Sequence, residues 1–140
     1  MRKVWIAGAV VAMLIAVTAG CLYMFDQALD TCGNKIVAAV QSPDGALKAV
    51  LFERDCGATT GFSSQVSVLA NDEMLANEGG NVFAADDNKG AADSAPWRGP
   101  MVKLKWRGPR HLEIHYDQFA RVHEKNQSAN GASIHFVPDL

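Results

Sequence analysis

The sequence predicts a mainly β protein, in which a small antiparallel β-sheet domain built from hairpins follows one N-terminal transmembrane helix. An unbroken apolar run extends from Val4 to Phe25. A strong turn sequence at residues 42–45 separates two apolar stretches. Apolar and polar residues alternate through residues 101–116, as in strands with one buried face. The expected parts are the membrane segment at 1–25, a linker at 26–34 and the β domain at 35–140.

The apolar run is long enough to cross a bilayer. As a helix, residues 4–25 would span about 33 Å at ~1.5 Å per residue. Arg2 and Lys3 precede the run, and no basic residue follows it until Lys35. The positive-inside rule therefore places the N-terminus in the cytoplasm and the β domain outside it. We expect a single-pass protein of the bacterial inner membrane, with its C-terminal domain in the periplasm or outside the cell.

Three fates of the apolar segment are considered. The run exceeds the roughly 7–15 residues of a signal-peptide core, which favours an uncleaved anchor. Residues 18–21, Thr-Ala-Gly-Cys, are similar to a bacterial lipobox, so the alternative is a lipoprotein acylated at Cys21. The run continues through Phe25, where a lipoprotein usually becomes polar. Simple cleavage after a small residue is the third alternative.

The first hairpin is expected to join residues 35–41 to residues 46–52. Pro43 and Asp44 suit the central turn positions, and Gly45 can take the left-handed conformation that closes a three-residue loop. Ser42 then faces Ala46. Both faces of the hairpin are apolar in mid-strand, which predicts a central hairpin covered on both sides.

The same register predicts a disulfide. It makes Lys35 face Glu53 and Cys32 face Cys56, although the cysteines were not used to choose the register. In an oxidising compartment two such cysteines most simply form a disulfide, here closing the open end of the hairpin.

Further strands are expected at residues 63–69, 73–76, 81–85 and 133–137, with a long polar loop at 86–100. Residues 118–125 fit either a short helix or an irregular crossing. The second hairpin, at 101–116, needs a three-residue loop at 108–110 to match its apolar faces. Trp106 then faces Leu112, Leu104 faces Ile114, and Lys105 faces Glu113 on the wet side.

Several of these stretches carry a family resemblance. They are the Ser-Pro-Asp-Gly turn at 42–45, the block RDCGATTGFSSQVSVL at 54–69, Gly-Asn-Val-Phe at 80–83 and the hairpin containing Leu-Glu-Ile at 112–114. Together they resemble a group of small, uncharacterised bacterial proteins with an exported or lipoprotein-like N-terminus. The likeness covers most of residues 26–137. It implies export and the fold, and it implies no activity.

One strand face has the residue types of a metal site. His111, Glu113 and His115 alternate, so they project to one side and could bind zinc, with His123 or His135 completing the set. The competing interpretation is a solvated face, because three cations are expected on the facing strand and would disfavour a divalent ion.

Three other features have a structural interpretation beside a functional one. Trp97 is either an exposed anchor for a partner or a plug of the core. The hydroxyls of Thr59, Thr60, Ser63 and Ser64, flanked by Gly57 and Gly61, suit either an anion nest or a tight turn. The polar residues Asp86, Asp87, Asn88 and Asp93 lack the EF-hand spacing, which favours a solvated loop over a calcium site.

Composition and motifs favour binding over catalysis. The net charge is −2, and there is no basic stripe with interleaved aromatics, so nucleic-acid binding is not expected. No nucleophile elbow is present, and no cofactor is expected. We predict a non-enzymatic envelope protein whose β domain binds a partner macromolecule, such as another envelope protein. The alternative is a small metal-dependent hydrolase that uses His111, Glu113 and His115.

Overall fold

The computed structural model describes residues 11–21, 32–57 and 60–140. The chain divides into two compact units, Met1–Thr31 and Cys32–Leu140. Residues 11–21 form a helix with exposed side chains. The remainder of the predicted membrane segment and linker residues 26–31 lie outside the described residues. Among the helices that the structure describes, none is both long and apolar enough to cross a membrane.

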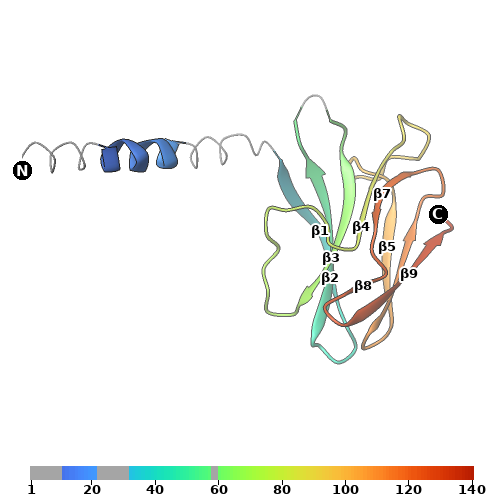
Figure 1. Cartoon of the computed structure of the whole chain (residues 1–140). Coiled ribbons are helices and arrows are strands. Elements are labelled where there is room, and N and C mark those ends of the chain that lie inside the picture. The colour runs from blue at the N-terminus through green and yellow to red at the C-terminus, as the bar shows by residue number, and fades with distance from the viewer. Residues whose placement is uncertain (1–10, 22–31, 58–59) are drawn as a thin grey trace, which may run out of the picture. The chain divides into compact units, whose positions relative to one another are not determined.

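The second unit is a β-sandwich of two sheets (Figure 1). The five-stranded sheet has the order β1-β2-β3-β4-β7. Its strands are β1 (Gly33–Gln41), β2 (Leu47–Asp55), β3 (Ser63–Ala70), β4 (Phe83–Asp86) and β7 (Arg121–Lys125). The four-stranded sheet has the order β5-β6-β9-β8. Its strands are β5 (Val102–Gly108), β6 (His111–Tyr116), β8 (Ser128–Ala129) and β9 (Ala132–Pro138).

The predicted mainly β, antiparallel fold is confirmed, with one unpredicted parallel pair. Every strand pair is antiparallel except β6 and β9, which run in the same direction with Leu112 beside Ile134. The connection between these two strands passes through β7 in the other sheet and then through β8. The last strand, β9, therefore pairs with the edge of β6 that β5 does not occupy.

The main core lies between the sheets and follows from alternation along the strands. Each strand turns every second side chain inward, and the inward positions are apolar. Their burial removes the largest side chains, Phe83, Leu112 and Ile114, completely from solvent. The inward set includes Leu47, Ala49, Leu51, Val66, Val68, Phe83, Ala85, Val102, Leu112, Ile114, Tyr116 and Ile134.

The prediction that the first hairpin is covered on both sides is correct for β2 and wrong for β1. The outward residues Val50 and Phe52 of β2 form a second buried cluster with Leu69, against which Leu75 packs. In contrast, β1 is the edge strand of its sheet, and Ile36 is 58% exposed.

A loop provides the outer cover of β2, so the predicted return strand at residues 73–76 is wrong. Residues 71–80 form turns and irregular backbone. The side-chain amide of Asn34 fastens this segment to β1 by donating to Ala76 O at 3.0 Å and Glu78 O at 2.7 Å.

The predicted three-residue turn of the first hairpin is also wrong. Ser42 N–H donates to Leu47 O at 2.9 Å, so Ser42 faces Leu47 and the loop contains four residues. The side chain of Ser42 favours this longer loop, because its hydroxyl accepts from Leu47 N–H and bonds Asp44 Oδ1. Gly45 has the positive φ, 70°, that the sequence predicted.

A β-bulge in β1 cancels the effect of the extra turn residue. The register shifts by one residue between Ile36 and Ala38. Beyond the bulge, Lys35 faces Glu53 as predicted. The predicted disulfide between Cys32 and Cys56 is formed.

The second hairpin confirms the predicted pairs. Trp106 faces Leu112, Leu104 faces Ile114, and Lys105 faces Glu113. A register shift between Trp106 and Gly108 then pairs Gly108 with His111, which shortens the predicted loop to residues 109–110. Residues 118–125, for which a helix or a crossing was expected, instead supply β7.

Replacing Cys32 and Cys56 by serine is expected to lower the free energy of unfolding by about 3 kcal/mol, because the bond restricts the unfolded chain. Denaturant unfolding of the full chain in a neutral detergent measures this difference. Cys21→Ser is the control, since it leaves the bond intact and should leave the midpoint unchanged. Two free thiols at positions 32 and 56 in alkylated, unreduced protein would contradict the pairing.

Candidate functional site

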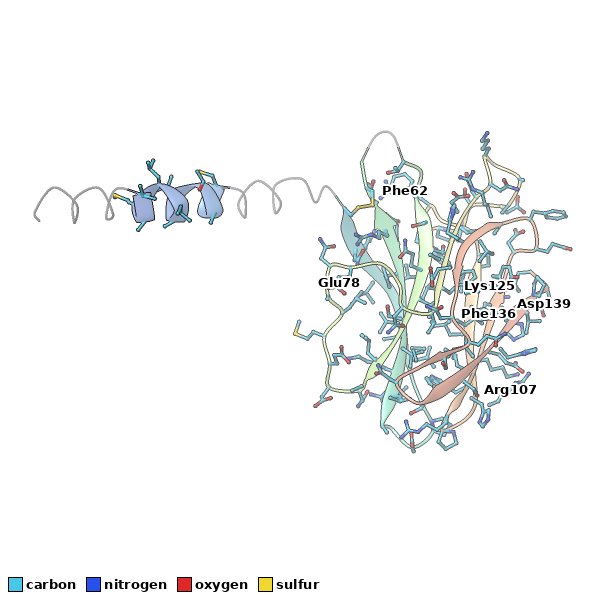
Figure 2. The ribbon with its side chains drawn as sticks, in the orientation of Figure 1. Phe62, Glu78, Arg107, Lys125, Phe136 and Asp139 are labelled. Atoms are coloured by element: carbon cyan, nitrogen blue, oxygen red, sulfur yellow. A yellow bond between two sulfur atoms is a disulfide. The ribbon has the colours of Figure 1, made fainter. Side chains whose placement is uncertain are left out.

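The predicted metal face of β6 is an ion-pair network. Arg107 Nε donates to Glu113 Oε2 at 2.7 Å. His115 lies between two carboxylates, with Nδ1 2.9 Å from Asp139 and Nε2 3.2 Å from Glu113. Carboxylates only accept, so both contacts are hydrogen bonds together only when the imidazole is protonated. Figure 2 labels Arg107, which lies on β5, and Asp139, which directly follows β9.

This network sets the charge of Glu113. The hydrogen bond from Arg107 lowers the pKa of the Glu113 carboxyl, partial desolvation opposes that effect, and His115 lowers the pKa further. Among the described residues, no group of three or more His, Cys, Asp or Glu side chains is placed to hold a metal ion.

The remaining histidines lie on different sheets. His135 stands beside Glu113 in the parallel pair of β6 and β9, and both line a shallow cavity of about 410 Å³ that includes His111. His123 lies on β7 of the five-stranded sheet, where its Nε2 is 2.7 Å from Asp86 Oδ2.

Trp97 packs against the core between the sheets, as the plug interpretation expects. Its Nε1 donates to Ser64 Oγ at 2.8 Å, and the Ser64 hydroxyl donates in turn to Pro100 O at 2.6 Å. Gly99 approaches the same serine so closely that a Cβ there would lie 2.8 Å from the Ser64 nitrogen. These contacts fasten the end of the long loop to the sandwich.

Trp97 also lines an apolar groove of about 480 Å³. The groove lies where the sheets present their edge strands, β1 and β5. Its walls are Val37, Ala38, Val40, Leu51, Trp97 and residues 101–104. One contact bridges the same two strands, since Trp106 Nε1 donates to Val40 O at 2.9 Å.

A buried carboxylate lies at the disulfide end of the sandwich. Glu53 is 3% exposed, and Arg98 Nη2 donates to its Oε1 at 2.6 Å. The guanidinium of Arg98 also stacks 3.8 Å from the centre of the Phe62 ring. In Figure 2, Phe62 lies at the same end of the domain as the disulfide, the yellow bond. Lys35 lies opposite Glu53 in the strand pair as predicted, but the ion-pair partner of Glu53 is Arg98, which was not predicted.

The four residues considered for a calcium loop do not act together. Asp86 ends β4 and accepts from the Asn88 backbone N–H at 2.9 Å. Asp87 accepts from Lys89 N–H at 3.1 Å, which forms a turn. The backbone N–H of Asp93 donates to Asp117 at 3.2 Å.

A polar row crosses the outer face of the five-stranded sheet and was not predicted. The register aligns Asn34, Arg54, Ser63, Asp86 and Arg121, one residue from each strand. Arg54 Nη1 donates to Asn34 Oδ1 at 2.7 Å. Arg121 Nη2 donates to Asp86 Oδ2 at 2.5 Å.

Four residues of the row, Arg54, Ser63, Asp86 and Arg121, line an open pocket of about 450 Å³. Of the hydroxyl residues considered for an anion nest, Thr60 and Ser63 line this pocket, whereas Ser64 is buried beneath Trp97. Thr59 lies outside the described residues. Gly57 takes a φ of 95°, and Thr60 N–H donates to Gly57 O at 3.2 Å.

Asp86 is the electrostatic centre of the pocket. Partial burial raises the pKa of its carboxyl, but the hydrogen bonds from Arg121, His123 and the Asn88 N–H outweigh burial and lower the pKa to about 2. The same contact with Asp86 raises the pKa of Arg121. A bulge in β7 opposite Ala84 and Ala85 leaves both Arg121 and His123 beside this carboxylate.

Asp86→Asn is expected to lower the free energy of unfolding by about 1 kcal/mol at pH 7, after allowance for solvent screening. The folded-state pKa is depressed, so the stabilisation is fully present above the ordinary pKa of 3.8 and is lost as the pH falls through about 2. Thermal unfolding from pH 7 to pH 2 should show the two proteins converging. Asp72→Asn, at an exposed turn, is the control; a gap that persists at pH 2 would contradict the account.

The chain was also compared with known proteins. No protein-family model, curated protein or solved structure matches it.

Proposed function

We propose that this chain is a non-enzymatic, membrane-anchored envelope protein whose exported β domain binds a partner protein. The apolar run at 4–25 and the basic residues before it support anchoring and export. The disulfide supports the same topology, because such bonds persist in oxidising compartments. In this proposal the run is retained as a transmembrane helix, and acylation at Cys21 is the alternative tether.

The observation that carries the binding function is the apolar groove between β1 and β5. Binding sites are typically concave and mostly apolar, with few polar groups. Here Val37, Val40, Trp97 and Leu104 line such a surface at the open edge of the sandwich. Trp97 can therefore complete the core and still present part of its ring to a partner.

The groove fits an extended apolar segment. Both walls are terminal strands of their sheets, and terminal strands offer backbone donors and acceptors to an added strand. The bulge at Val37 interrupts the regular edge of β1, which restricts pairing to a segment that matches it. Lys103 at the rim favours an acidic residue beside the apolar ones.

Met101→Glu is expected to abolish partner binding, because it places a charge on the groove wall. A photo-crosslinking residue at exposed Lys103 of the full chain in its native membrane should give one discrete adduct, and Met101→Glu should remove it. Met74→Glu is a matched control, because Met74 is 87% exposed and lies outside the groove.

Two results would contradict the proposal. One is equal loss of the adduct in Met101→Glu and Met74→Glu. The other is stoichiometric zinc in the purified chain that disappears in His115→Ala, which would favour the hydrolase alternative.

Membrane attachment has its own test. With a retained anchor, the chain should sediment with membranes at its full mass, and Cys21→Ser should change neither property. A mature chain that begins at an acylated Cys21, and that Cys21→Ser prevents from forming, would establish the lipoprotein instead. Soluble mature protein beginning after the apolar run would contradict tethering altogether.

A further inference from the structure

The pocket beside the disulfide gathers hydrogen-bond donors from separate strands. Arg54 comes from β2, Gln65 from β3, and Arg121 and His123 from β7. Among the described residues that line it are two guanidinium groups and one carboxylate, Asp86, so the formal charge of this set is positive although the chain as a whole is negative. A concave surface of this charge favours anions.

Asp86 orients Arg121 and His123 and contacts only some of their side-chain nitrogens. Arg121 gives Nε and Nη2 to Asp86, while its Nη1 makes no hydrogen bond to any residue that the structure describes. His123 gives one ring nitrogen to Asp86, and its Nδ1 likewise has no partner among the described residues. Because the carboxylate holds both side chains, the Nη1 group of Arg121 is fixed in place before any ligand arrives. The second ring nitrogen of His123 is a donor only when the imidazole is protonated.

We infer that this pocket binds a phosphate-type oxyanion, with the Nη1 group of Arg121 as its main contact. A guanidinium presents N–H groups in a fork that matches phosphate geometry. Thr60, Ser63 and His123 line the same cavity, where the hydroxyls of Thr60 and Ser63 donate to Gly57 O and Arg54 O. The pocket is separate from the apolar groove, with which it shares no lining residue.

The oxyanion could be a free phosphate or a phospholipid head group. Six residues, 26–31, lie between the end of the apolar run at Phe25 and Cys32, which is bonded to Cys56 on the pocket wall. A chain anchored by that run keeps the pocket within reach of anionic head groups. The lipid source rests on the proposed anchoring, whereas oxyanion binding does not.

The test uses the labelled full chain in a neutral maltoside detergent, titrated with inorganic phosphate and, separately, with dihexanoyl phosphatidylglycerol. The NMR signals of the Arg121 and His123 side chains should shift saturably with at least one of them. Saturation by the lipid alone assigns the head group, and equal saturation by inorganic phosphate assigns a free phosphate.

Arg121→Gln should weaken binding of the phosphate or the lipid about tenfold, which is the scale of one charged hydrogen-bonded contact. The His123 signals report the binding in this variant. Arg121→Lys should recover part of it, because it keeps the charge and loses the fork. Arg107→Gln is the matched control, since both arginines are 50% exposed and each pairs with a carboxylate. No saturable shift, or equal weakening by both Gln variants, would overturn the inference. Sedimentation of the same chain with membranes reports on anchoring independently.

Discussion

The need to cover both faces of β2 governs this domain. Four consecutive residues, 49–52, are apolar and buried, so no single layer can remove this strand from water. The four-stranded sheet covers one face. The segment at 71–80 covers the other with Leu75 and is held on β1 by Asn34. What looks like a polar connection is therefore a structural layer, and β1 is left at the edge.

Local sequence patterns predicted both hairpins because turn chemistry and alternation act between neighbours. They could not reveal the bulge at Val37, whose apolar neighbours fit either face. The prediction of the disulfide was correct although the predicted turn was one residue too short, because this bulge restores the register. The positions between turn and bulge were assigned to the wrong partners: Ala39 faces Val50, not Ala49.

The grouping of Asp86, Arg121 and His123 in the candidate pocket was not predicted because it depends on contacts between distant parts of the chain. Asp86 lies 35 positions from Arg121 and 37 from His123. The bulge in β7 breaks the alternation that would mark this strand in the sequence. After Val122, the two polar residues His123 and Glu124 follow in succession at the bulge. The signal that remained was Val122 between Arg121 and His123, too short a pattern to distinguish a strand from a turn of helix.

The position of β9 has a consequence for the order of assembly. Hairpin β1–β2 is local in sequence and can close, with its disulfide, before the later strands are in place. One edge of β6 pairs with β5 and the other with β9, the last strand of the domain, so the second edge stays unpaired until β9 is available. Closure of the sandwich is thus a late event, because β6 can pair with β9 only when two distant segments of the chain meet. Long-range pairing of this kind slows folding. A domain of this topology completes its core only when β9 is in place.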